Sequence, residues 1–340
     1  MTAVASEIRE MGARARVAGR RLASTPTAPR NAALASIAAR LESGAAAILQ
    51  ANREDYQAAR DTGLDDHMLD RMLLDERRLG GIAADVRSVL ALPDPVGESF
   101  DARTLPNGLR VERRRVPLGV IGAIFESRPN VTVDIAALCL KSGNAAILRG
   151  GKEAARTNRA LADLIKGASI EAGLPEDAVQ LVRSTDRELV MEMLHLDEYI
   201  DLMIPRGGAD LVRLVNEHAR MPAVTGGIGV CHTYVDASAD TEMAVEIVVN
   251  AKTRRPTICN ALDTVLVHSA AAPELLPEIA GGLGERGVEL RCDPASLEIL
   301  SGTPGVRAVA AGEGDFGCEF LALVAAVRVV ESVEEAIAHI

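Results

Sequence analysis

The sequence predicts an α/β protein with two parallel-sheet domains and a small β hairpin. From residue 118 onward, short β-branched apolar runs alternate with amphipathic helix-like segments, which is typical of a parallel sheet covered by helices. Residues 5–92 consist largely of good helix formers, with Asn31 as a candidate helix N-cap. A Pro-Asn-Gly turn at residues 106–108 follows and precedes an alternating run, so residues 100–118 predict a protruding hairpin.

Each strand of this alternating region can be predicted from its own residues. Each strand is a run of β-branched or small apolar residues, and each is followed by a segment with helical periodicity or by a glycine-rich turn. In an open parallel sheet, ligands bind at the carboxyl ends of the strands. The expected strands span residues 119–125, 144–150, 178–183, 199–208, 223–236, 262–268, 288–293 and 321–330.

Bulk composition excludes several classes of protein. The net charge of −11 argues against nucleic acid or an acidic membrane as the main partner, and no apolar run approaches the length of a membrane span. The Arg-rich N-terminus carries Glu7 and Glu10 at the spacing of an amphipathic helix, so we expect a cytoplasmic protein without a signal peptide. The five cysteines include no CxxC pair and no zinc spacing, which predicts reduced thiols and no metal site.

Cys259 is the candidate nucleophile. It lies in the predicted loop between a helix ending near residue 254 and the strand at 262–268. Lys252, Arg254 and Arg255 lie just upstream, and nearby cations lower the pKa of a thiol and so favour the nucleophilic thiolate. The alternative interpretation is a buried loop cysteine that packs as a small hydrophobic residue.

A glycine pair, Gly150-Gly151, follows the strand at 144–150 and is flanked by Arg149 and Lys152. Such a strand-to-helix turn lets backbone amides approach a phosphate or ribose. The two cations at this turn would favour the 2′-phosphate of NADP(H). The alternative is a solvated basic turn.

Two further glycine-rich turns precede Cys259. Gly207-Gly208 opens a helix, where the pyrophosphate of a dinucleotide could bind, and Gly226-Gly227 permits close backbone approach. Each could be ordinary loop chemistry. Together, three such turns ahead of a loop cysteine favour a dinucleotide-dependent enzyme.

The segments at residues 116–154, 201–211, 224–236 and 249–267 resemble the gamma-glutamyl phosphate reductases, members of the aldehyde dehydrogenase superfamily. The resemblance covers essentially the whole chain. It implies a helical region with a Rossmann-like NADP-binding domain at residues 1–255, a catalytic domain at 256–340 and a small oligomerisation flap at about 100–118. It also implies a chain several dozen residues longer, in agreement with the absence of a C-cap after the helix that Ser332 begins.

The resemblance further implies NADPH-dependent reduction of gamma-glutamyl phosphate to glutamate 5-semialdehyde and phosphate, the second step of proline biosynthesis. Cys259 would form a thioester, with its own backbone amide and the side chain of Asn130 as candidate oxyanion donors. In hydrolytic members of the superfamily, a Glu that activates water precedes a glycine pair. Thr225 takes its place here, which favours transfer to phosphate.

The phosphate and α-carboxylate of this substrate need cations, for which Arg128, Lys252, Arg254 and Arg255 are candidates. Expected partners are phosphate, a second copy of the chain in a homo-oligomer, and a glutamate 5-kinase that supplies the acyl phosphate. The alternative functions are an aldehyde dehydrogenase that acylates CoA and a catalytically inactive dinucleotide-binding module.

Overall fold

The computed structural model describes residues 3–226 and 229–340. The chain divides into two compact units, a first unit at residues 1–226 and a second unit at 227–340. The boundary lies earlier than the expected one at 255/256. The reason is that residues 231–253 form a strand and a helix of the second unit, and the strand pairs with the strand that follows Cys259.

The first unit begins with helices, as the helix-forming composition predicts. Asp75 caps α5 by accepting a hydrogen bond from the Arg78 amide, a common way of satisfying a free helix N–H. Among the described residues, no single helix is long and apolar enough to cross a bilayer. Helices α2 and α3 together reach that length and composition, but they are bent by 68° where they join. These helices are α1 (Ala3–Ala23), α2 (Thr27–Ser43), α3 (Ala45–Asp61), α4 (Asp66–Met72) and α5 (Glu76–Ala91).

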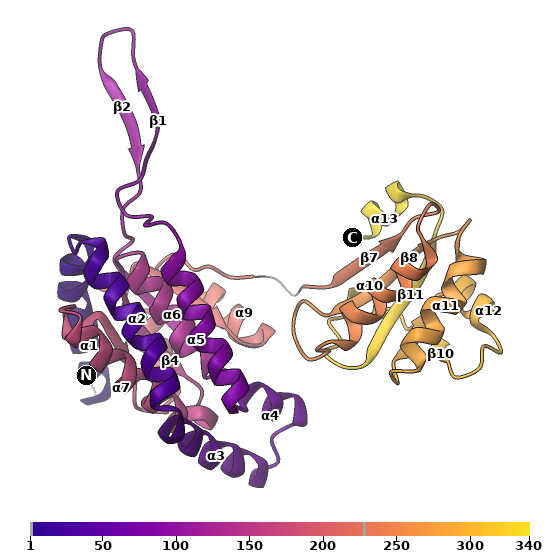
Figure 1. Cartoon of the computed structure of the whole chain (residues 1–340), viewed down its shortest axis with the longest axis horizontal. Helices are drawn as coiled ribbons and strands as arrows, with labels where there is room; N and C mark the ends of the chain where they lie inside the picture. The colour runs from indigo at the N-terminus through magenta and orange to yellow at the C-terminus, as the bar shows by residue number, and fades with distance from the viewer. Residues whose placement is uncertain (1–2, 227–228) are drawn as a thin grey trace. The chain divides into compact units, whose positions relative to one another are not determined.

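The predicted hairpin is present and projects from the helices of the first unit (Figure 1). Strands β1 (Ser99–Thr104) and β2 (Arg110–Arg114) pair antiparallel, with a register irregularity between Phe100 and Arg103. Gly108 has φ 85°, which a residue with a Cβ rarely adopts, so the turn depends on this glycine. Nearly all of the strand residues are exposed.

The sheet of the first unit is parallel, in the order β5-β4-β3-β6. The central strand β3 is buried at every position, which explains its uninterrupted apolar sequence. The chain runs outward from β3 to β5 and then returns to the other side of β3, so the strand order reverses between β3 and β6. In sheets of this kind the ligand crevice lies at that reversal, outside the carboxyl ends of the strands.

Helices α6 to α9 connect and follow these strands. In the first unit the elements are β3 (Val120–Phe125), α6 (Asn130–Lys141), β4 (Ala145–Gly150), α7 (Ala155–Glu171), β5 (Val179–Leu181), α8 (Glu188–Leu194), β6 (Leu202–Arg206) and α9 (Ala209–His218).

The second unit has its own parallel sheet, in the order β10-β9-β11-β8-β7, and its own apolar core. Ser332 caps the last helix by accepting from the Glu335 amide, as its sequence predicts. The elements are β7 (Cys231–Val235), α10 (Thr241–Thr253), β8 (Leu262–His268), α11 (Ala272–Gly284), β9 (Glu289–Cys292), α12 (Pro294–Leu300), β10 (Arg307–Ala310), β11 (Val324–Val330) and α13 (Val333–His339).

Candidate active site

Cys259 lies in the loop between α10 and β8, and it is exposed. The loop is built from local turns, in which the Ala261 amide donates to the Ile258 carbonyl at 3.0 Å. It therefore presents the thiol to solvent at the amino end of β8. The alternative of a buried, packed cysteine does not hold.

Arg254 and Arg255 are exposed at the start of this loop, but Lys252 is not. The side chain of Lys252 is 0% exposed, and its Nζ donates to the Leu262 carbonyl at 2.8 Å. The expectation that Lys252 binds substrate is therefore wrong in this structure. Helical spacing explains why, because Ala244, Val248 and Lys252 lie four residues apart on the buried face of α10.

Lys252 is paired with Asp263, which the sequence analysis missed. Asp263 is 2% exposed, and its Oδ1 lies 3.8 Å from the Lys252 Nζ. Its Oδ2 accepts from the Cys231 amide at 3.2 Å, and its Oδ1 accepts from the Phe320 amide at 3.1 Å. The sequence contains one indication of this pair. An aspartate lies inside the apolar run of β8, and a buried charge requires partners.

In the first unit, the loop after β3 is held in a strained conformation. Ser127 has φ 45° and is buried, and the Oε1 of Glu153 accepts from both its amide, at 2.6 Å, and its hydroxyl, at 2.9 Å. A non-glycine residue in this region persists only when its surroundings enforce it. Glu153 thus fixes the loop that carries Arg128 and Asn130, two of the candidate site residues.

Asn130 is the first residue of α6, and its Nδ2 donates to the Asp134 Oδ2 at 2.9 Å. Burial raises the pKa of Asp134 to about 6, against the opposing effect of this hydrogen bond. One amide hydrogen of Asn130 is thereby engaged within α6, and the second remains for another acceptor.

Arg149, at the end of β4, is 8% exposed and has an unsatisfied hydrogen-bonding group. Its Nε is buried without a partner, while its Nη2 makes only long contacts to the Thr185 and Asp186 carbonyls, at 3.4 and 3.5 Å. Burial lowers the pKa of Arg149, and the nearby carboxylate of Glu153 opposes that shift. A buried cationic donor without a partner fits an anionic ligand.

A pocket lies at the carboxyl ends of β4 and β5, next to the Gly150-Gly151 turn, and Arg149 itself is not among the residues that line it. A Cβ at Gly150 would clash with the Asn158 side chain, so this glycine is required for the close packing of α7 on the strand end. Lys152 is exposed immediately after this turn. The pocket is lined by Gly150, Gly151, Ala155, Asn158, Arg159 and residues 181–185, of which sequence reasoning had identified only the glycine turn.

The turn after β6 is close to the end of β3. The Gly208 amide donates to the Glu126 Oε2 at 2.9 Å, and a Cβ at Gly207 would clash with the same carboxylate and with Leu211. An anion, here the carboxylate of Glu126, therefore already binds the N-terminus of α9, where a pyrophosphate was expected. Gly226 is exposed with open space around it, and Gly227 lies outside the described residues.

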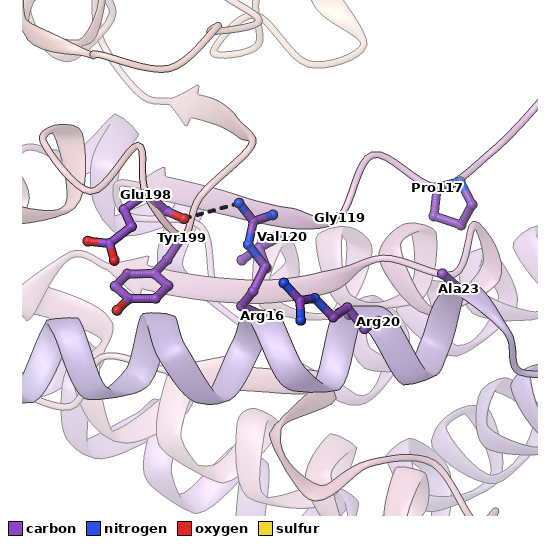
Figure 2. A pocket seen from close by; sticks show the side chains of 9 residues that line it. Arg16, Arg20, Ala23, Pro117, Gly119, Val120, Glu198 and Tyr199 are labelled. Carbon is purple, nitrogen blue, oxygen red and sulfur yellow. Dashed lines mark hydrogen bonds between the residues drawn. The ribbon is translucent and has the colours of Figure 1, made fainter.

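A second pocket lies at the opposite, amino end of this sheet, next to Gly119 and Val120 (Figure 2). Arg16 points toward Glu198 and donates to its backbone carbonyl at 3.1 Å, and it also forms an ion pair with Asp201 at 2.6 Å. Because its principal cation is already paired and it lies away from the carboxyl ends of the strands, this pocket is not the candidate site.

Comparison with known proteins defines the family. Residues 1–285 match the sequence profile of the aldehyde dehydrogenase family. The gamma-glutamyl phosphate reductase of Roseiflexus castenholzii is 57% identical over 339 residues, which cover 98% of this chain and 80% of the relative. That of Dehalococcoides mccartyi is 53% identical, with 98% and 79% covered.

Solved structures support the same family assignment. The gamma-glutamyl phosphate reductase of Thermotoga maritima superposes with a TM-score of 0.88 at 42% identity, covering 97% of this chain and 78% of that one. An acetylating aldehyde dehydrogenase from Geobacillus thermoglucosidasius has a TM-score of 0.69 at 19% identity, with 99% and 78% covered. The latter likeness is one of fold alone.

Proposed function

This chain belongs to the aldehyde dehydrogenase family and, within it, to the gamma-glutamyl phosphate reductases, and we propose on that basis that Cys259 carries its chemistry. The reaction is the reduction of gamma-glutamyl phosphate to glutamate 5-semialdehyde and phosphate, the second step of proline biosynthesis. The CoA-acylating and inactive-module alternatives have no observation in their favour.

The observation that carries the role of Cys259 is its exposure. Of the five cysteines, Cys139 and Cys292 are buried, and burial raises the pKa of each to about 12. Burial also raises the pKa of Cys231 and of Cys318, both of which are half-buried. These four thiols therefore stay protonated at neutral pH, whereas Cys259 is open to a substrate.

The proposed reaction has two stages, transfer of the acyl group to Cys259 and reduction of the thioester. The Cys259 thiolate attacks the acyl carbon of gamma-glutamyl phosphate, so that a C–S bond forms, the C–O bond to phosphate breaks and phosphate leaves with the electron pair. Membership of this family implies a nicotinamide dinucleotide, which when bound would provide the hydride for reduction of the thioester on Cys259. Collapse of the resulting thiohemiacetal returns the thiolate and releases the aldehyde.

Charge on the carbonyl oxygen needs hydrogen-bond donors at both stages. The backbone amide of Cys259 and the uncommitted amide hydrogen of Asn130 stay the predicted donors. Arg128, Arg254 and Arg255 stay the predicted cations for the phosphate and α-carboxylate, since Lys252 is buried. The acyl acceptor in the reverse direction is phosphate.

For the cofactor we propose NADP(H). The buried Arg149, with its unpartnered Nε, would bind the 2′-phosphate, and Lys152 lies exposed at the same turn. Gly150 and Gly151 provide the close backbone approach beside them. The turn at Gly207-Gly208 stays a prediction for the pyrophosphate, and the turn at Gly226-Gly227 stays a prediction for close backbone approach to the cofactor. The Gly208 amide now donates to the carboxylate of Glu126, so this carboxylate would have to move before a pyrophosphate could bind there.

Three wider predictions accompany this function. The β1-β2 hairpin would serve as an oligomerisation flap, glutamate 5-kinase would supply the labile acyl phosphate, and the enzyme would work in the cytoplasm.

The decisive experiment is NADP reduction with glutamate 5-semialdehyde and phosphate by the chain and by its Cys259→Ser variant. We expect loss of turnover by at least about 1,000-fold, since a hydroxyl is a much weaker nucleophile than a thiolate. The matched control is Cys318→Ser, a half-buried cysteine of the same unit, which should retain activity. Full turnover by Cys259→Ser would refute the proposal.

Replacing phosphate by CoA in the same assay tests the acceptor. Turnover with CoA and none with phosphate would identify an acylating enzyme. NADPH binding, followed by fluorescence, without a single-turnover burst would identify an inactive module.

A further inference from the structure

The second unit contains a buried charged pair that the proposed chemistry does not use. Lys252 and Asp263 are almost completely inaccessible, yet their charged atoms lie 3.8 Å apart, which is a loose ion pair. Replacing a buried ion pair with apolar side chains is often neutral or stabilising, so such a pair is weak evidence for a role in stability. Its hydrogen bonds show what else it does.

Each oxygen of Asp263 holds a backbone amide of another segment. Oδ2 accepts from Cys231, the first residue of β7, and Oδ1 accepts from Phe320, just before β11. The register between β7 and β8 explains the geometry. Cys231 pairs with Leu262 and His232 with Thr264, so Asp263 is the extra residue of a bulge. Bulges redirect a side chain and are frequent beside active sites.

Lys252 completes the arrangement from α10. Its Nζ donates to the carbonyl of Leu262, the residue before Asp263, and lies 5.8 Å from the ring centroid of Phe320. The ammonium therefore compensates the carboxylate and binds the start of β8. Four segments of the unit, namely α10, β7, β8 and the residues before β11, therefore meet at this one buried pair.

Cys231 connects this pair to the nucleophile. Its Sγ donates to the backbone carbonyl of Cys259 at 3.4 Å. Burial and the nearby carboxylate of Asp263 raise the pKa of Cys231, so the group remains a thiol and a donor. A carbonyl held in place fixes the peptide plane that follows Cys259, and with it the ψ angle of the nucleophile.

We propose that Cys231 is a positioning residue for Cys259, oriented by the buried pair of Asp263 and Lys252. The inference rests on the proposed function of Cys259. The thiol holds the exposed loop in the conformation from which the sulfur attacks an acyl group. Small errors in such geometry reduce rates strongly even when the reactive group stays intact.

The test compares Cys231→Ala with Cys231→Ser, in the full chain. Cys292→Ala is the matched control, because it removes a buried thiol of the same sheet, at the end of β9. The readouts are kcat and KM in the phosphate-dependent reaction, the alkylation rate of Cys259 by iodoacetamide, and amide exchange in the peptide spanning Thr257–Ala261.

For Cys231→Ala we expect kcat to fall about tenfold with KM changed less than about twofold, and alkylation to stay within about twofold of wild type. Exchange in the loop peptide should rise about two- to tenfold, the effect of losing one hydrogen bond. Cys231→Ser should recover most of kcat, because its hydroxyl can donate to the same carbonyl. Cys292→Ala should leave all three readouts at the wild-type level.

Two results would overturn the positioning role. One is an unchanged kcat and unchanged loop exchange in Cys231→Ala. The other is an equal loss in Cys231→Ala and Cys231→Ser, which would indicate packing rather than a hydrogen bond. Failure of the proposed function is separate, since it would appear as an inactive wild type while loop exchange still reports on Cys231.

Discussion

The substitution Arg149→Met should weaken the binding of NADPH much more than the binding of NADH. The Arg149 side chain is buried and its Nε has no partner, although the carboxylates of Glu153 and Glu126 act on its charge from nearby. A 2′-phosphate would supply the missing acceptor, and a hydrogen bond between charged groups contributes about 1.5–3 kcal/mol. Arg149→Met should therefore raise the Kd for NADPH about 10- to 100-fold and change the Kd for NADH less than about threefold.

The same substitution has an unusual expected effect on stability. Burying a cation costs desolvation, and for Arg149 this effect outweighs the nearby carboxylate of Glu153, so an apolar side chain of similar length should leave the Tm unchanged or raise it by a few degrees. Fluorescence titration with each nucleotide and thermal unfolding measure both effects. Arg53→Met, at an exposed arginine of α3, is the control and should change neither affinity.

An equal loss of affinity for both nucleotides in Arg149→Met would show that the cation does not contact a 2′-phosphate. A drop in Tm of more than about five degrees would show that Arg149 is a structural residue.

Two other predictions concern buried charges. The pKa of Asp134 is raised to about 6, so its carboxyl stabilises the fold while protonated and loses that contribution as pH rises from about 4 through 6. Asp134→Asn should therefore increase the free energy of unfolding by about 2 kcal/mol at pH 7 and by almost nothing at pH 4. Urea denaturation measures this free energy, and equal gains at both pH values would contradict the prediction. Lys252→Met should destabilise the second unit by about 3–5 kcal/mol, because Asp263 is left buried without a cation. Adding Asp263→Asn should restore only part of that loss, as measured by amide exchange in β8, because it removes the buried charge but its Nδ2 cannot accept from one of the two backbone amides that Asp263 holds. Equal losses in the single and double variants would exclude the pairing.

Local pattern in the sequence was sufficient for much of the fold. The alternation of apolar runs and amphipathic segments predicted the parallel strands, and the turn at residues 106–108 predicted the β1-β2 hairpin. The capping residues Ser332 and Glu335 marked the start of α13. These features depend on neighbours within a few residues, so they can be recognised without knowing the fold.

The domain boundary could not be found in this way. Residues 231–253 continue the same strand-helix alternation as the first unit, and from sequence we interpret the glycine-rich segment at 225–229 that precedes them as a cofactor-binding turn and not as a linker. Their assignment depends on whether β7 pairs with β6 or with β8, which is a long-range choice. The expectation placed the boundary after the helix, and the pairing of β7 with β8 places it before the strand.

The sequence by itself determined that a cysteine follows a helix and precedes a strand, with cations upstream and three glycine-rich turns earlier in the chain. Only the tertiary structure decided which charges face solvent. Lys252 and Arg254 are two residues apart, yet one is buried on the core face of α10 and the other is exposed in the loop. The physical reason is that a charge is stable in the core only when distant residues supply its partners, and Asp263, Cys231 and Phe320 meet around Lys252 only after the sheet has formed.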